Sequence, residues 1–101
     1  MILYNITYSV DADIEAEWIN WMKQSHIPNV LKTGRFEGYK FLRLLNEEAD
    51  TNGVTYALQF FAQTIGDLES YLSTEAPALQ KAHMDKYGSR FVAFRTLLEE
   101  I

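Results

Sequence analysis

The sequence predicts an α+β domain whose elements follow the order β-α-β-β-α-β. Three observations support this order. Four stretches have the alternating or apolar residues of strands, two repeat apolar residues at helical spacing, and glycines stand at several of the boundaries. The chain has 101 residues, which is the size of one domain, since single domains commonly span ~100 to 150 residues. We therefore treat residues 1–101 as a single domain.

The first strand and the first helix are expected before residue 34. Residues 2–10, ILYNITYSV, alternate strictly between a large apolar face and a mixed face, as a strand does. Asp11 and Asp13 are candidate N-caps, so a helix is expected from about residue 13. Gly34 follows the last periodic residue and is expected to end this helical region.

A hairpin is expected next. Residues 35–45 carry apolar groups on both faces, which predicts a strand covered on both sides. An acidic stretch from Asn46 then ends in Asn52-Gly53, a strong turn signal, and predicts a hairpin with a longer loop. The second strand of this hairpin is expected over residues 54–62.

The second helical region begins where Thr64 and Asp67 resemble a capping box. The run STEAP predicts a break, with Ser73 or Thr74 capping a further helical piece that Pro77 enters near its first turn. Gly88 is expected to end this piece. Residues 90–98, RFVAFRTLL, then predict a last strand with both faces partly apolar.

This order is the ferredoxin-like arrangement, in which two right-handed crossovers place both helices on one face of a four-stranded antiparallel sheet. Two helices cover only one face, and the other still carries large apolar groups on at least two strands. An exposed apolar sheet face is typical of association. We therefore predict a homodimer that packs through this open face.

Residues Trp18 to Leu31, WINWMKQSHIPNVL, combine a helical apolar stripe with a histidine and a proline. At about 100° per residue, Trp18 and Met22 lie on the stripe and His26 lies at its margin. Pro28 lacks a backbone N–H, so the helix is expected to kink or restart there. His26 is the candidate catalytic acid or base. The alternative is that it bonds the freed carbonyls or interacts with the helix dipole.

Further candidate ligand-binding residues surround this histidine in the predicted fold. An arginine would bind a carboxylate or enolate, tyrosines would donate hydrogen bonds, and Trp18, with Trp21, would form an aromatic wall on the stripe that also holds Met22. Surface ion pairs and ordinary core packing are the alternatives for these residue types. The candidates besides His26 are Tyr8, Trp18, Met22, Arg43, Tyr87 and Arg90.

Composition excludes several classes of function. The net charge of -5 and the dispersed Lys and Arg residues argue against nucleic acid and anionic membranes. There are no cysteines and only two histidines, His26 and His83, so no metal site is expected. His83 is expected to be buried and satisfied by one local partner. One histidine is enough for axial haem ligation, which a Soret band after haem addition would reveal, but no cofactor is expected. Without a signal peptide or a spanning stretch, a cytoplasmic location is expected.

The chain resembles the dimeric α+β barrel superfamily, and in particular a group of short bacterial proteins within it. The resemblance covers nearly the whole chain and rests on the topology and on the stretches WINWMKQSHIPNVLKTGRF and HMDKYGSRFVAFRTLLE. It implies that His26 lies at the pocket mouth. The superfamily includes cofactor-independent monooxygenases, haem-degrading enzymes, lactone isomerases and non-catalytic ligand sensors. Two functions therefore stay open: a small-molecule-binding module, or a cofactor-independent enzyme acting on a small apolar or anionic substrate.

Overall fold

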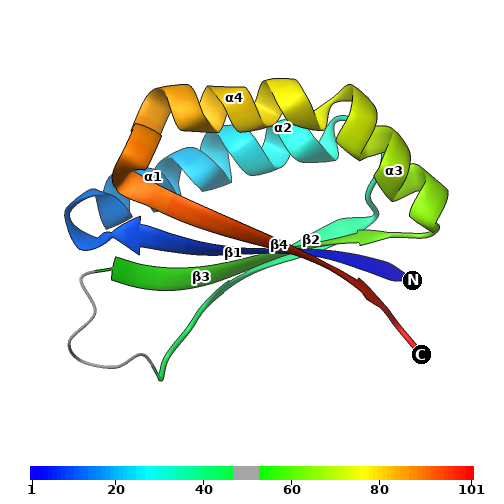
Figure 1. Ribbon diagram of the computed structural model, residues 1–101, viewed down its shortest axis with the longest axis horizontal. Coiled ribbons are helices and arrows are strands. Elements are labelled where there is room, and N and C mark those ends of the chain that lie inside the picture. Colours follow the sequence, from blue (N-terminus) through cyan, green and yellow to red (C-terminus); the bar gives the residue numbers. More distant parts are fainter. Residues whose placement is uncertain (47–52) are drawn as a thin grey trace.

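One antiparallel sheet forms the floor of the molecule and the helices form a single layer above it (Figure 1). The computed structural model describes residues 1–46 and 53–101. The strands follow the spatial order β2-β3-β1-β4. This confirms the predicted ferredoxin-like topology. The strands are β1 (Ile2–Asp11), β2 (Gly38–Arg43), β3 (Gly53–Ala62) and β4 (Phe91–Glu99).

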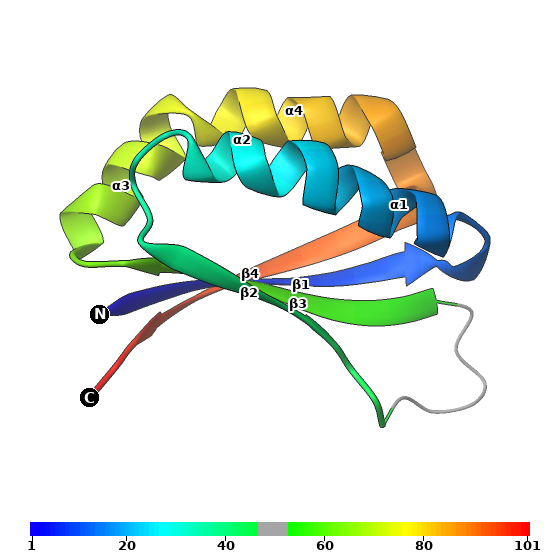
Figure 2. The same cartoon turned by 180° about the vertical axis from the view of Figure 1, so that it is seen from behind.

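The helical layer has two parts that run side by side over the sheet, and neither view shows a helix of the described residues on the other face of the sheet (Figures 1 and 2). The first part changes its helix type twice along its length, and the second part breaks once. No helix in the described ranges is long and apolar enough to cross a membrane. The first part is α1 (Glu15–Trp21), a π-helical segment (Met22–His26) and α2 (Ile27–Leu31), and the second is α3 (Ile65–Thr74) and α4 (Ala76–Tyr87).

The predicted helix ends are partly right. The Thr64 hydroxyl accepts a hydrogen bond from the backbone N–H of Asp67, and Gly88 ends α4 with a positive φ of 56°, as expected. Asp11 and Asp13 make no capping hydrogen bond, because both carboxylates accept hydrogen bonds from the Arg90 guanidinium instead. Helix α1 is entered through a 3₁₀ turn at Ala12–Ile14.

The break between α3 and α4 also differs from the prediction. Glu75, rather than Ser73 or Thr74, precedes α4, and it makes no side-chain capping bond. The Ser73 hydroxyl donates to the backbone carbonyl of Glu69, one turn back, and is therefore not used as a cap. Pro77 lies in the first turn of α4, as predicted.

Strand β2 was predicted to be covered on both faces, and this prediction is wrong. The strand lies at the edge of the sheet, is shorter than residues 35–45, and leaves most of its side chains exposed. The strand carries apolar groups on both faces because one face is turned toward the helical layer and the other belongs to the open face of the sheet. The predicted hairpin turn at Asn52 lies outside the described residues.

The pairing register divides the sheet into two chemically distinct faces. On the covered face of β1, Tyr4, Ile6, Tyr8 and Val10 are buried against the helices. On the open face, Leu3 pairs with Phe61 and with Leu98, which makes an apolar row across three strands. A second row joins Phe94, Thr7, Ala57 and Leu42, and the polar row Thr96, Asn5, Gln59 and Lys40 lies between the two.

Candidate functional site

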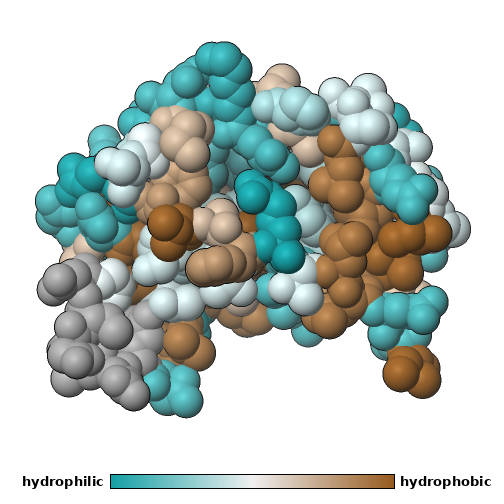
Figure 3. All heavy atoms as spheres, viewed as in Figure 1, coloured by the Kyte–Doolittle hydropathy of each residue, from teal (hydrophilic) through white to brown (hydrophobic). Residues whose placement is uncertain are grey.

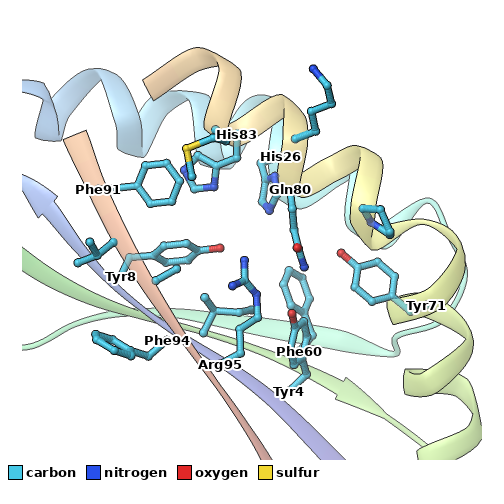
Figure 4. A pocket seen from close by; sticks show the side chains of 16 residues that line it. Tyr4, Tyr8, His26, Phe60, Tyr71, Gln80, His83, Phe91, Phe94 and Arg95 are labelled. Carbon is cyan, nitrogen blue, oxygen red and sulfur yellow. The ribbon is translucent and has the colours of Figure 1, made fainter. Parts of the chain in front are cut away.

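Beside β4, the helices and the sheet leave a cavity of about 720 Å³ between them. Strands β1 and β4, with Phe60 of β3, form its floor, and the π-helical segment, α3 and α4 form its roof. The surface is hollowed between the helices and β4 (Figure 3). Much of the lining is aromatic or aliphatic, with polar side chains entering from both layers (Figure 4). We call this space the β4 cavity; its polar lining residues are Tyr4, Tyr8, His26, Tyr71, Gln80, Lys81, His83 and Arg95.

The floor of the cavity follows from strand alternation and register. Tyr4 and Tyr8 flank Ile6 on the covered face of β1, and Ile6 pairs with Arg95 of β4. Because directly paired residues share a face, Arg95 also points toward the helices. Its guanidinium lies between Tyr8 and Tyr4 and extends toward the histidines (Figure 4). Arg95 forms no ion pair with a carboxylate in the described parts of the chain.

The π-helical segment turns His26 onto the cavity. A π-helical turn contains more residues than an α-helical turn, so each residue is rotated by less than 100°. This rotation moves His26 from the predicted margin of the stripe to a buried position, with 7% of its surface exposed. A kink or restart was expected at Pro28, but His26 and Ile27 both keep right-handed helical geometry, and only the helix type changes, from π to α, at Ile27. The His26 ring lies 5.4 Å from the Trp21 ring and 5.3 Å from the His83 ring, measured between centroids.

His83 is held in a fixed orientation by the core. The indole Nε1 of Trp18 donates a hydrogen bond to His83 Nε2 over 2.9 Å, and Phe91 stacks on the imidazole with 3.9 Å between centroids. An indole N–H only donates, so Nε2 must carry a lone pair and the proton of the neutral ring must be on Nδ1. This geometry agrees with the prediction of a buried histidine satisfied by one partner.

The buried titratable groups of the cavity are neutral at pH 7. Burial lowers the pKa of His26 to about 4, and the positive charge of Arg95 lowers it in the same direction. Burial likewise lowers the pKa of His83 to about 3. The positive charge of protonated His26, and then that of Arg95, lower this pKa in the same direction. Burial raises the pKa of Tyr4, Tyr8 and Tyr71 above its ordinary value. The charged lining residues are therefore Arg95 and Lys81, and Lys81 pairs with Asp85 at 2.7 Å.

Of the residues predicted from sequence, His26 and Tyr8 line the β4 cavity. Trp18 and Met22 have no exposed surface and belong to the core beside it. Tyr87 is also buried outside the lining, and its hydroxyl has no partner among the described residues.

The two predicted arginines lie elsewhere. Arg90 Nε contacts Asp11 at 2.7 Å, and its guanidinium also contacts Asp13. Arg43 donates to the Tyr56 hydroxyl, which in turn donates to Glu15. Arg43 and Tyr56 also line a smaller cavity of about 320 Å³ beside β2. Both arginines therefore already have carboxylate partners, unlike Arg95.

Sequence reasoning missed Arg95, Tyr71 and Gln80 as lining residues. The useful signal for Arg95 was the alternation of Phe91, Ala93 and Arg95 along β4, which places a cation on an otherwise apolar face. Tyr71 and Gln80 had no comparable signal, because the break between α3 and α4 determines where they point. In the described ranges no group of three His, Asp or Glu side chains is arranged to hold a metal ion.

The fold is shared with several solved structures. An EthD (ethyl tert-butyl ether D) family protein from Bacillus halodurans is 14% identical, with full coverage of both chains and a TM-score of 0.68. Hydroxynitrile lyase from Passiflora edulis is 16% identical over 99% of this chain and 95% of its own, with a TM-score of 0.63. A dimeric ferredoxin-like protein from an uncultured marine organism is 12% identical over 99% and 97% of the two chains, with a TM-score of 0.53.

At these identities the likeness shows the fold alone. No curated protein sequence matches the chain. One family model, described as a domain of unknown function, DUF4286, matches residues 1–101. With every residue of the chain included in that match, this protein belongs to the DUF4286 family.

Proposed function

We propose that this protein is a homodimeric small-molecule-binding module whose ligand occupies the β4 cavity. The observation that carries the proposal is the cavity itself, because ligand sites typically span ~300 to 1,000 Å³ and combine apolar walls with a few converging polar groups. The β4 cavity, at about 720 Å³, has this size and composition. Arg95 and Gln80 enter it from opposite layers.

The open sheet face supports the homodimer. Its two apolar rows would be buried if the same face of a second copy packed against it, and the polar row between them would fix the register. The fold is also that of a structure described as a dimeric ferredoxin-like protein. Leu98→Lys places a charge in one apolar row and should yield monomers. Ile65, which is 47% exposed on α3 against 46% for Leu98, provides the matched control, and Ile65→Lys should leave the dimer intact.

Native mass spectrometry of freshly purified protein tests both parts of the proposal. We expect the mass of two chains together with the added mass of a small molecule. The result that contradicts the proposal is a single-chain mass at micromolar concentration with no added small molecule.

A second candidate is a cofactor-independent enzyme, of the monooxygenase or isomerase type, that uses His26 for acid–base chemistry. The observation in its favour is that the His26 side chain lines the cavity and makes no hydrogen bond within the described residues. With a pKa of about 4 it is a weak base at neutral pH. An anion bound next to Arg95 would oppose the positive charge that lowers this pKa and would raise it toward the useful range.

The histidine distinguishes the two candidates once a ligand has been identified in the mass spectrum. An enzyme should lose turnover in His26→Gln and keep its affinity for the ligand. If turnover is unchanged in this variant, His26 is not the acid or base.

A further inference from the structure

We propose that the ligand of the β4 cavity is a small monoanion, a carboxylate on a flat apolar body, and that Arg95 binds its charge. This inference rests on the proposed function and narrows it to a ligand class. What supports it is which charged side chains line the cavity and which of them already have an ion-pair partner.

The lining has the opposite charge balance to the rest of the chain. The chain contains 14 Asp and Glu against nine Lys and Arg, yet no Asp or Glu among the described residues lines the cavity. Two cations, Arg95 and Lys81, do. Because Lys81 already pairs with Asp85, one uncompensated positive charge remains, on Arg95. An anion that enters this apolar cavity loses its water and needs a positive partner, and Arg95, exposed at the cavity mouth, can supply that charge.

The groups around Arg95 suit a carboxylate. A guanidinium offers two parallel N–H donors that match the two carboxylate oxygens. Tyr8 and Tyr4 lie on either side of the guanidinium and Gln80 faces it from the roof (Figure 4), so neutral donors are available beside the charge. His26 and His83, both neutral at pH 7, add no competing charge.

The rest of the lining indicates what apolar body the ligand has, and the single arginine indicates how much charge it carries. Phe60 and Phe91 line the same cavity and offer flat apolar surface for an aromatic or similarly planar group. A phosphate monoester carries about −1.5 to −2 charges at pH 7 and would leave part of its charge unpaired against one arginine. The structure therefore favours a monocarboxylate over a phosphate.

Three probes with the same apolar body separate these possibilities: 2-naphthoate, its uncharged amide 2-naphthamide, and 2-naphthyl phosphate. Each is titrated by calorimetry at pH 7 into the wild-type chain and three variants. Arg95→Gln removes the charge, Arg95→Lys keeps it without the planar donor pair, and Lys32→Gln removes one charge from an exposed helix end outside the lining.

We expect 2-naphthoate to bind on the order of 10- to 100-fold more tightly than the amide, and also more tightly than the phosphate. Arg95→Gln should abolish the preference over the amide. Arg95→Lys should weaken the binding of naphthoate and keep the preference, which preserves the test if the glutamine variant does not fold. Lys32→Gln should behave as wild type.

The outcomes separate the two proposals. Equal binding of naphthoate and amide, or a preference that survives in Arg95→Gln, overturns the inference and leaves the proposed function standing. Tighter binding of the phosphate overturns the assignment to a monocarboxylate. If none of the three probes binds at millimolar concentration, the proposed function is overturned and the inference with it.

Discussion

The space between the sheet and its helices is filled around Trp18 and hollow beside β4. In the filled region, Trp18 and Met22 have no exposed surface, and the Trp18 ring lies 5.3, 5.7 and 5.2 Å from the rings of Tyr8, Phe41 and Tyr56. The hollow region is the β4 cavity, where Arg95 has no carboxylate partner in the described chain. The same layer boundary thus stabilises the fold in one half and leaves room for a ligand in the other.

The boundary between the two regions is the pair formed by Trp18 and His83. Trp18 belongs to the filled region and donates to His83, which lines the cavity. The core therefore determines the orientation of a cavity wall. Substitutions in the filled region should change stability, whereas substitutions in the hollow region should change binding.

The largest effect is expected in the filled region. Trp18→Ala removes a fully buried aromatic ring and the donor to His83, and should lower the free energy of unfolding by about 3–5 kcal/mol in urea titrations. Trp21 is only half-buried, so Trp21→Ala should lower the free energy of unfolding by a clearly smaller amount. Equal losses from the two substitutions would contradict the division into two regions.

A smaller loss of stability for each residue is expected on acidification, and it comes from the cavity wall. The pKa values of His26 and His83 in the folded chain, about 4 and about 3, lie below the unfolded value of about 6.5. The unfolded chain therefore binds more protons between these values, so stability is full above pH 6.5 and falls toward pH 4. At pH 5 each histidine should lower the free energy of unfolding by about 2 kcal/mol relative to its value at pH 7.

The control for this acid effect is a single-histidine chain. In His26→Gln the loss between pH 7 and pH 5, measured by urea unfolding at both values, should fall to about half. If wild type and variant lose the same free energy, His26 is not the buried neutral group described here.

The smallest effect on stability is expected at Arg95. Its side chain is exposed to the cavity mouth and makes no ion pair in the described chain, so Arg95→Met should change the free energy of unfolding by no more than about 0.5 kcal/mol. Thermal unfolding monitored by circular dichroism measures this change. A loss above about 2 kcal/mol would mean that Arg95 supports the fold, as Trp18 does.

Local sequence patterns were sufficient for the fold. The alternation in residues 2–10, the Thr64 cap and Gly88 fixed three element boundaries without reference to any other part of the chain. The candidate site was only partly predictable, because Arg95 enters it through its register with Ile6, which is distant in sequence. The assumption of a constant rotation of 100° per residue also placed His26 wrongly, because no local sequence pattern indicates a π-helical segment.

The three methionines provide the most direct test of the comparison between the filled and the hollow region. Met22 lies in the filled region, Met84 lines the β4 cavity, and Met1 lies at the exposed N-terminus. In a chain labelled with ¹³C at the methionine methyl groups, and assigned with Met84→Leu, titration with 2-naphthoate should shift the Met84 signal and leave the Met22 and Met1 signals in place. A shift at Met22 with Met84 unchanged would contradict the account, because the ligand would then enter the region described here as filled.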